Sequence, residues 1–179
     1  MTASDDLLHR IENDPALAEL LVWPGDFDIE RRDPVEELRL PNGMPLYPIA
    51  GCGAGGTYFL CGEPGVQQRP VLYADSEGQA TLMADDLVEA IRLIAHCPYW
   101  RDLGAGFPWH ELEEDMRDDH PDFDELRDRL LKALDLEPLP AEQAVTRLRA
   151  TAARTSPDFA PVSTENDRMP YELLFARGL

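Results

Sequence analysis

The sequence predicts an α+β fold in which a curved antiparallel sheet is flanked by helices, with an additional helical segment toward the C-terminal end. Three observations predict this fold. Residues 4–22 carry apolar side chains at helical spacing, residues 35–83 hold short runs of strand-forming residues between turn residues, and helical spacing returns from residue 84 onward. Because 44% of the 179 residues are hydrophobic, the chain can bury a sizeable core.

Two short helices are expected at the start of the chain. The first covers residues 4–12, and its apolar face consists of Leu7, Leu8 and Ile11. Asp14 suits the N-cap of the second helix and Pro15 suits its first turn. The buried stripe of this second helix consists of Leu17, Leu20 and Leu21. Trp23 and Phe27 follow in a turn-rich stretch, and we interpret both as core residues.

Four runs between residues 35 and 83 are typical of strands: PLYPI, TYFLC, PVLYA and QATLM. Glycine, proline or acidic turn residues separate them. Residues 75–78 (DSEG) lie between the last two runs and predict a hairpin turn. Helical spacing then resumes over residues 84–97, where Leu87, Ile91 and Ile94 occupy one face.

Proline and glycine residues interrupt the pattern between residues 98 and 108. They predict a boundary between an α+β unit, residues 1–100, and an acidic helical extension packed on it, residues 101–179. Three helices are expected in the extension, near residues 109–118, 122–135 and 140–154. In the second of them, Asp122 and Glu125 resemble a capping box, and the apolar stripe consists of Phe123, Leu126, Leu130 and Leu134.

The last part of the chain is expected to return to the body of the protein. Residues 155–168 have the composition of a loop. After this loop comes an apolar group that would dock on the core, made of Tyr171, Leu173, Leu174 and Phe175.

Residues 51–56, GCGAGG, match the G-x-G-x-x-G spacing of dinucleotide-binding loops. In those folds the loop leads into a helix whose amide groups meet the phosphate, whereas here Thr57, Tyr58 and Phe59 begin a strand. We therefore interpret the glycines as a tight turn or bulge at the entrance to a strand, and we expect no nucleotide cofactor.

The segment from His110 to Asp124 is rich in potential metal ligands but lacks the spacing of a metal site. A zincin needs a second histidine four residues after the first, where Glu114 stands, and a calcium loop opening at Asp118 needs a glycine where Phe123 stands. The chain has no G-x-S-x-G nucleophile elbow, and no pair of carboxylates is singled out for acid–base chemistry. We expect neither catalysis nor a bound metal, and a metal-dependent hydrolase is the least favoured alternative.

Charge is the most unusual property of the composition. The chain has 16 Lys and Arg against 35 Asp and Glu, a net charge of −19. This charge disfavours direct binding of nucleic acid and favours a basic protein partner, although an acidic surface that serves only solubility or salt adaptation is an alternative. Three widely spaced cysteines, the absence of a secretory signal and the lack of an apolar span of membrane length predict a cytoplasmic protein with reduced thiols.

The strands and helix of the central region carry a resemblance to a known family. The segments GGTYFLCGE, RPVLYADSEG and ATLMADDLVEAIRLI contain a glycine-led strand, a second strand ending in an acidic turn, and a short strand that feeds an amphipathic helix. This order resembles the SUKH superfamily, which includes the SMI1/KNR4-like proteins. The resemblance implies a curved sheet flanked by helices and, as for many bacterial members, an immunity protein that neutralises a toxin, often a nuclease. Eukaryotic relatives imply a scaffold or regulatory interaction module instead.

A basic toxin domain would be expected to dock on the most acidic part of the chain. Residues 111–128 hold ten acidic residues and two arginines, a net charge of −8. Complementary charge would accelerate encounter there, and exposed aromatic side chains would slow dissociation. The sheet face that carries Tyr58 and Tyr73 is the alternative docking site. The candidate contact residues are Trp109, Glu113, Glu114, Asp118, Asp119, Asp122, Phe123, Tyr58 and Tyr73.

Overall fold

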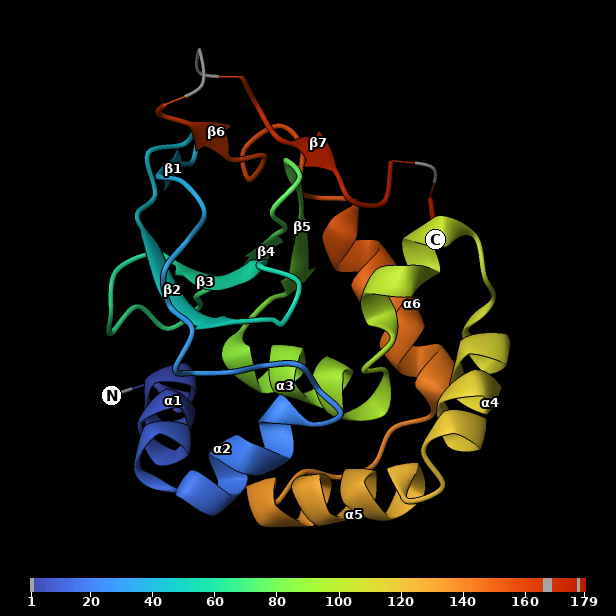
Figure 1. Cartoon of the computed structure of the whole chain (residues 1–179). Helices are drawn as coiled ribbons and strands as arrows, with labels where there is room; N and C mark the ends of the chain where they lie inside the picture. Colours follow the sequence, from blue (N-terminus) through green and yellow to red (C-terminus); the bar gives the residue numbers. More distant parts are fainter. Residues whose placement is uncertain (1, 166–168, 177) are drawn as a thin grey trace.

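The computed structural model describes residues 2–165, 169–176 and 178–179 and has the predicted α+β architecture (Figure 1). Its helices are α1 (Ala3–Asn13), α2 (Pro15–Val22), α3 (Leu87–His96), the 3-10 helix η1 (Trp100–Ala105), α4 (Trp109–Asp119), α5 (Phe123–Leu134) and α6 (Ala141–Ala152). Its strands are β1 (Leu38–Arg39), β2 (Leu46–Gly51), β3 (Thr57–Cys61), β4 (Val71–Ala74), β5 (Gln79–Ala84), β6 (Val162–Ser163) and β7 (Glu172–Leu173). Within the described part of the chain, no helix has the length and apolar character needed to cross a membrane.

The larger sheet has the strand order β2-β3-β4-β5-β7, and β1 pairs with β6 in a separate two-stranded sheet. Strands β2, β3, β4 and β5 pair with one another in antiparallel orientation, as predicted, whereas β7 pairs with β5 in parallel. In the hairpin between β4 and β5, the Asp75 carboxylate accepts the N–H groups of Glu77 and Gln79, and Gly78 has a φ of 93°. The acidic residue and the glycine set this turn, which confirms the predicted hairpin.

Both edges of the larger sheet are interrupted. Along β2, Pro48 carries no N–H, the register shifts next to it, and Gly51 exchanges backbone hydrogen bonds with Asp28. On the far side of β5, the N–H of Leu82 donates to the hydroxyl of Thr155 at 2.9 Å instead of to another strand. Neither edge therefore presents a continuous row of unpaired backbone groups.

The second helix begins where its capping residue predicts. Asp14 Oδ1 accepts the N–H groups of the two residues after Pro15, each at 3.1 Å, which confirms the predicted start of α2. Helix α1 is tied to the loop before β4 by an ion pair of 3.1 Å between Asp5 and the buried Arg69. These contacts fix the helical layer against the sheet.

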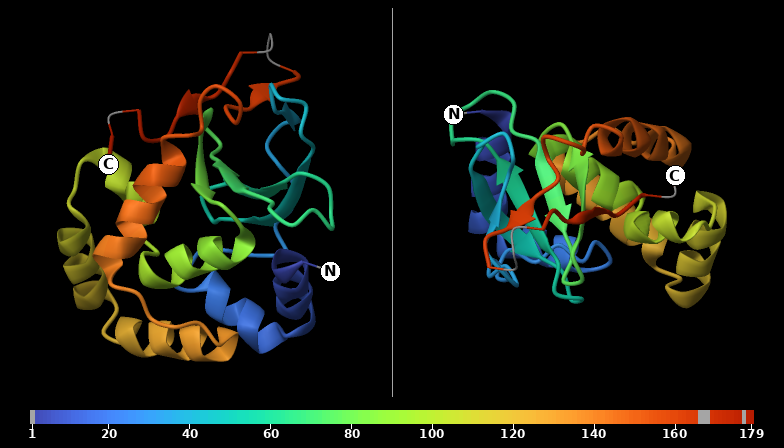
Figure 2. Two further views of the ribbon diagram at one scale, coloured as in Figure 1. Left: turned by 180° about the vertical axis from the view of Figure 1, so that it is seen from behind. Right: turned by 90° about the horizontal axis from the view of Figure 1, so that it is seen from above.

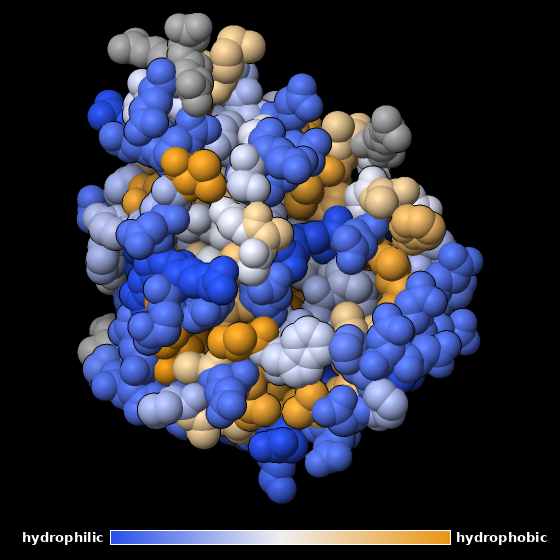
Figure 3. All heavy atoms as spheres, in the orientation of Figure 1, coloured by the Kyte–Doolittle hydropathy of each residue, from blue (hydrophilic) through white to orange (hydrophobic). Residues whose placement is uncertain are grey.

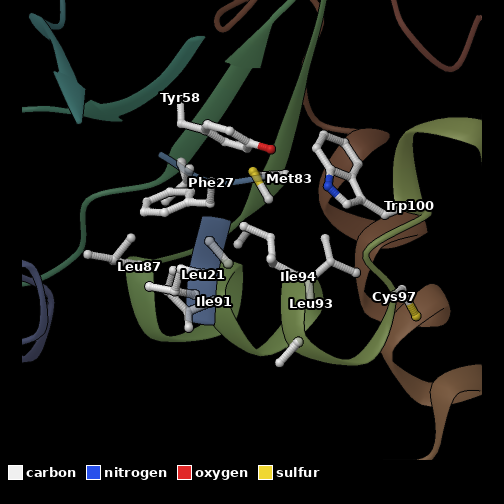
Figure 4. Close-up of a cluster of buried hydrophobic side chains, with 14 of the residues drawn as sticks. Leu21, Phe27, Tyr58, Met83, Leu87, Ile91, Leu93, Ile94, Cys97 and Trp100 are labelled. Atoms are coloured by element: carbon white, nitrogen blue, oxygen red, sulfur yellow. The ribbon is translucent and has the colours of Figure 1, made fainter. Parts of the chain in front are cut away.

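The larger sheet is buried on both faces. One face adjoins a buried cluster that contains Phe27, Tyr58 and Trp100 together with side chains of the helices (Figure 4). The opposite face carries a second cluster, which includes Phe59 and Leu72 and is completed by side chains near β1 and β7. Alternate residues of a strand enter different clusters, and for this reason β3 and β4 are buried throughout.

The predicted boundary near residue 100 lies within the first of these clusters. The chain turns through η1, and Trp100 in this 3-10 helix has no exposed surface. Leu130 and Leu134 of α5 and Leu148 of α6 belong to the same cluster as the sheet residues. The helical extension is therefore continuous with the core of the α+β unit.

The C-terminal residues return to the body, as predicted. The N–H of Leu174 donates to the carbonyl of Ala80 at 2.9 Å, and the ring centroid of Phe175 lies 6.3 Å from that of Trp100. Figure 2 shows this segment running from β7 toward η1 and α6. The predicted loop over residues 155–168 contains the short strand β6, and its residues 166–168 lie outside the described residues.

Candidate partner-binding surface

An exposed acidic surface extends along α4, the turn after it and α5. Eight of its carboxylates are exposed, and among the described residues none of the eight forms an ion pair. We refer to these eight residues as the acidic face: Glu111, Glu114, Asp115, Asp118, Asp119, Asp122, Glu125 and Asp128. The surface over α4 is predominantly hydrophilic (Figure 3). Four of the predicted contact residues, Glu114, Asp118, Asp119 and Asp122, belong to this face.

Glu113 lies beneath the acidic face. Its side chain is buried, with Oε1 accepting hydrogen bonds from Arg127 Nη2 at 2.5 Å and from the Tyr99 hydroxyl at 3.2 Å. Oε2 lies 3.0 Å from Arg117 Nη2. Successive residues of a helix point about 100° apart, so Glu113 faces the core while Glu114 faces solvent. The prediction that Glu113 contacts a partner is wrong, because its own neighbours enclose the carboxylate.

The two arginines in residues 111–128 pair with carboxylates that are not part of the acidic face. Arg117 Nε lies 3.0 Å from Asp124 Oδ2, and Arg127 lies 3.6 Å from the same carboxylate and donates to the carbonyl of His96. The hydrogen bond from Arg117 holds the pKa of Asp124 below its usual value. Because both arginines bind Glu113 and Asp124, neither neutralises the acidic face.

His96 completes this interior charge network. The imidazole is buried at the end of α3, and its Nε2 accepts the N–H of Leu139 at 3.0 Å. Burial, together with the positive charges of Arg127 and Arg92, lowers the pKa of His96 to about 4. The histidine is therefore neutral at pH 7 and acts as a hydrogen-bond acceptor.

The aromatic residues predicted for this surface lie largely inside it. Phe123 is buried, and the guanidinium of Arg127 lies 4.3 Å from its ring centroid. The expectation that Phe123 is an exposed contact is wrong, because its helical stripe faces the core. Trp109 at the start of α4 is half-buried and packs against the first buried cluster, so a partner could touch only part of its ring.

The alternative prediction, a docking site on the sheet face that carries Tyr58 and Tyr73, is wrong. Tyr58 and Tyr73 do share one sheet face, with ring centroids 5.1 Å apart, but helices cover that face and both rings are buried. The Tyr58 hydroxyl donates to the Asp26 carbonyl, and Arg101 donates to the Tyr73 hydroxyl. Burial raises the pKa of both tyrosines. The nearly continuous apolar runs TYFLC and VLYA are the sequence signal of a sheet buried on two faces.

One exposed aromatic residue does adjoin the acidic face. Trp23, which the sequence analysis places in the core, is 48% exposed, and its ring meets His120 edge to face at a centroid distance of 4.6 Å. His120 lies in the turn between α4 and α5, and Val22 beside the tryptophan is also exposed. The sequence feature that could have predicted the exposure of Trp23 is its position, because it follows the end of a short helix whose buried stripe ends at Leu21. Phe27 is buried, as predicted.

Asp122 precedes α5 but does not cap it as predicted. Among the described residues its side chain makes no capping hydrogen bond, and its φ of −89° and ψ of 4° differ from the extended backbone of a capping box. The capping-box prediction is wrong, and the consequence for the surface is direct. The Asp122 carboxylate stays exposed as part of the acidic face.

The glycine motif forms a turn between β2 and β3, as predicted. Cys52 N–H donates to the Gly56 carbonyl at 3.0 Å, and Gly55 N–H donates to the Cys52 carbonyl at 3.1 Å. A Cβ atom at Gly56 would lie 2.2 Å from the Tyr73 hydroxyl oxygen, so close packing requires glycine there. The motif thus has a packing role in this turn.

The remaining candidates for a reactive site are clusters of metal-binding side chains and the cysteine thiols. Over residues 2–165, 169–176 and 178–179, no three His, Cys, Asp or Glu side chains are grouped to hold a metal ion. Burial raises the pKa of Cys61 to about 12 and that of Cys97 to about 11, so both thiols stay protonated at pH 7.

Comparisons with family models, curated proteins and solved structures give no match to this chain. The surface itself therefore has to indicate the function. The acidic face presents eight exposed carboxylates without ion-pair partners among the described residues, next to the exposed Trp23. This combination suits the binding of a positively charged macromolecular surface.

Proposed function

We propose that the chain is a non-catalytic binding protein that docks a basic protein partner on the acidic face, with Trp23 as an aromatic contact at its border. One observation carries the proposal. Eight exposed carboxylates lack ion-pair partners among the described residues, while the neighbouring Arg117 and Arg127 pair with Glu113 and Asp124 instead. A folded protein gains no stability from such clustered like charges, so a role in binding accounts for them.

Electrostatics and apolar contact would have separate roles in this interaction. The field of the acidic face accelerates encounter with a cationic partner, and added salt weakens this effect because surface charges are screened within about 10 Å at 0.1 M ionic strength. The exposed edge of Trp23 supplies apolar area, which slows dissociation. Charge would therefore govern the association rate and the tryptophan the dissociation rate.

The proposed partner is a basic toxin domain, and the chain would act as its immunity protein. The resemblance to the SUKH superfamily supports this choice, since β3, the β4–β5 hairpin and α3 follow one another in the order that the resemblance implies. Occlusion of a toxin by a bound acidic surface needs no catalytic group on this chain. Neutralisation would follow from blocked access to a basic, nucleic-acid-binding surface.

Charge reversal tests the location of the interface. We expect Asp118→Lys combined with Asp119→Lys to slow association with the protein encoded by the adjoining gene by at least tenfold at low salt. The matched control reverses two exposed acids elsewhere, Glu77 and Asp158, and changes the total charge equally. Biolayer interferometry over a series of salt concentrations measures both. Equal effects of the two double variants, or an association rate independent of salt, would contradict the proposal.

Trp23→Ala tests the aromatic contact separately. Removing the exposed ring should leave the association rate within about twofold and raise the dissociation rate about tenfold. Protection of cells that co-express the adjoining gene product then measures the biological outcome. A Trp23→Ala variant that protects and dissociates as the parent protein does would exclude this residue from the interface.

A further inference from the structure

A groove with a different chemical character lies between α3, α6 and the end of β5, and it shares no residue with the acidic face. Figure 2 shows α6 lying beside β5 and α3. The groove has a volume of about 390 Å³. Apolar side chains that include Met83, Leu93, Leu139, Leu148 and Ala150 line it, and its charged lining consists of Asp85, Glu89, Arg92, Arg147 and Arg154.

The charged lining has more cations than anions. Glu89 bridges two guanidinium groups, with Oε1 at 2.7 Å from Arg92 and Oε2 at 2.8 Å from Arg147. The third guanidinium, that of Arg154, pairs with Asp85. Three arginines thus share two carboxylates, which leaves one positive charge in a chain whose net charge is −19. One further carboxylate would balance the lining.

Arg92 also has an unused hydrogen-bond donor. Its Nε is buried and, within the described part of the chain, has no hydrogen-bond partner, although its Nη1 binds Glu89. A buried donor without a partner costs free energy, and guanidinium groups bind carboxylates through two parallel N–H groups. A carboxylate that reached the Nε edge of Arg92 would remove this cost.

We propose that this groove binds a small amphipathic monocarboxylate, with the apolar chain on the hydrophobic lining and the carboxylate among Arg92, Arg147 and Arg154. The volume lies within the range of small-molecule sites, about 300 to 1,000 Å³. The apolar lining provides the driving force for the chain, and the single excess positive charge selects one negative charge. This inference is independent of the proposed partner on the acidic face.

Three ligands test separately whether the groove binds the apolar chain and whether it binds the carboxylate: sodium octanoate, 1-octanol and sodium acetate. Isothermal titration calorimetry with the full chain should show one octanoate bound with a Kd of about 1 mM or tighter. Octanol, which lacks the charge, and acetate, which lacks the chain, should each bind at least tenfold more weakly. Equal affinity for octanoate and octanol, or no octanoate binding, would overturn the proposal.

Substitutions then locate the site. Arg147→Gln should weaken octanoate binding about tenfold, whereas Arg129→Gln, an exposed position on α5 outside the groove, should leave it unchanged. Ala150→Leu, at an exposed position of the lining, should weaken binding by filling the groove. If Arg147→Gln fails to fold, Arg154→Gln replaces it, with the same expected loss.

The Nε–H resonance of Arg92 gives a direct readout. We expect octanoate to shift this signal in a proton–nitrogen correlation spectrum, because the carboxylate would supply the missing acceptor. Equal octanoate affinity in Arg147→Gln and Arg129→Gln, or an unchanged Arg92 signal at saturation, would place the ligand elsewhere and overturn the assignment. A leucine-ending tetrapeptide that binds more tightly than octanoate through its free carboxylate would assign the groove to peptide termini and overturn it as well.

Discussion

The acidic face and the charge network directly beneath it come from the same stretch of sequence, yet their charges have opposite surroundings. Outside, eight carboxylates point into water without ion-pair partners among the described residues. Inside, the single carboxylate of Glu113 receives hydrogen bonds or ion pairs from Arg127, Arg117 and Tyr99. The contrast between Glu113 and Glu114 shows that helical orientation, and not composition, separates structural charge from surface charge.

The largest effect that would test this contrast is expected from Glu113→Ala. Removing the carboxylate leaves Arg127 buried without its main partner, and breaking a buried ion pair costs about 3–5 kcal/mol of the free energy of unfolding. Glu114→Ala, one residue away on the acidic face, should change it by less than about 0.5 kcal/mol. Urea unfolding of both variants measures the difference. Similar losses would show that the two carboxylates are not in distinct environments.

A second effect concerns acid stability and depends on His96. Its pKa is about 4 in the folded state against an ordinary 6.5, so between these values the unfolded state binds more protons and acidification favours unfolding. Stability attributable to the neutral imidazole is complete above pH 6.5 and falls by about 3 kcal/mol by pH 4. His96→Gln keeps an acceptor for Leu139 and removes the titration.

The measurement is the difference in unfolding free energy between the parent protein and His96→Gln across this pH range. Carboxylates such as Asp124 titrate in both proteins and cancel in the difference. The free energy of the parent protein should decline more steeply as the pH is lowered. If the unfolding free energies of the two proteins changed in parallel with pH, folding would not lower the pKa of the His96 imidazole.

The smallest effect is expected on the acidic face. Asp118→Asn combined with Asp119→Asn should stabilise the protein by a few tenths of a kcal/mol at low salt, because it relieves repulsion between exposed like charges. In 1 M salt the gain should vanish. Glu77→Gln, in the isolated hairpin turn, is the control and should show no gain. A destabilising effect would mean that these aspartates have structural partners.

Much of the fold is predictable because local chemistry agrees with it. The Asp14-Pro15 cap, the DSEG hairpin and the helical stripe of α3 each fix an element through neighbouring residues alone. The pairing of β7 with β5 and of β1 with β6 is different. Strands β1, β6 and β7 have two residues each, and their pairing depends on contacts between distant parts of the chain, which periodicity does not report.

The candidate surface was predictable in charge but not in its aromatic contacts. The density of acids in residues 111–128 locates the acidic face, since most exposed charges lie where a polar helix face lies. The solvent exposure of Tyr58, Phe123 and Trp23 depends on which element covers each ring. That covering is a tertiary property, and only the apolar runs of β3 and β4 hint at it in the sequence.

The interrupted sheet edges limit the ways in which another chain can engage this protein. Recognition by strand addition needs a free row of backbone donors and acceptors, whereas Pro48 and the Gly51–Asp28 bridge break the row at β2, and Thr155 occupies the Leu82 donor beyond β5. A partner therefore has to bind through contacts with side chains of this protein and not through its backbone groups. The same property guards a concentrated solution of the protein against edge-to-edge stacking into fibrils.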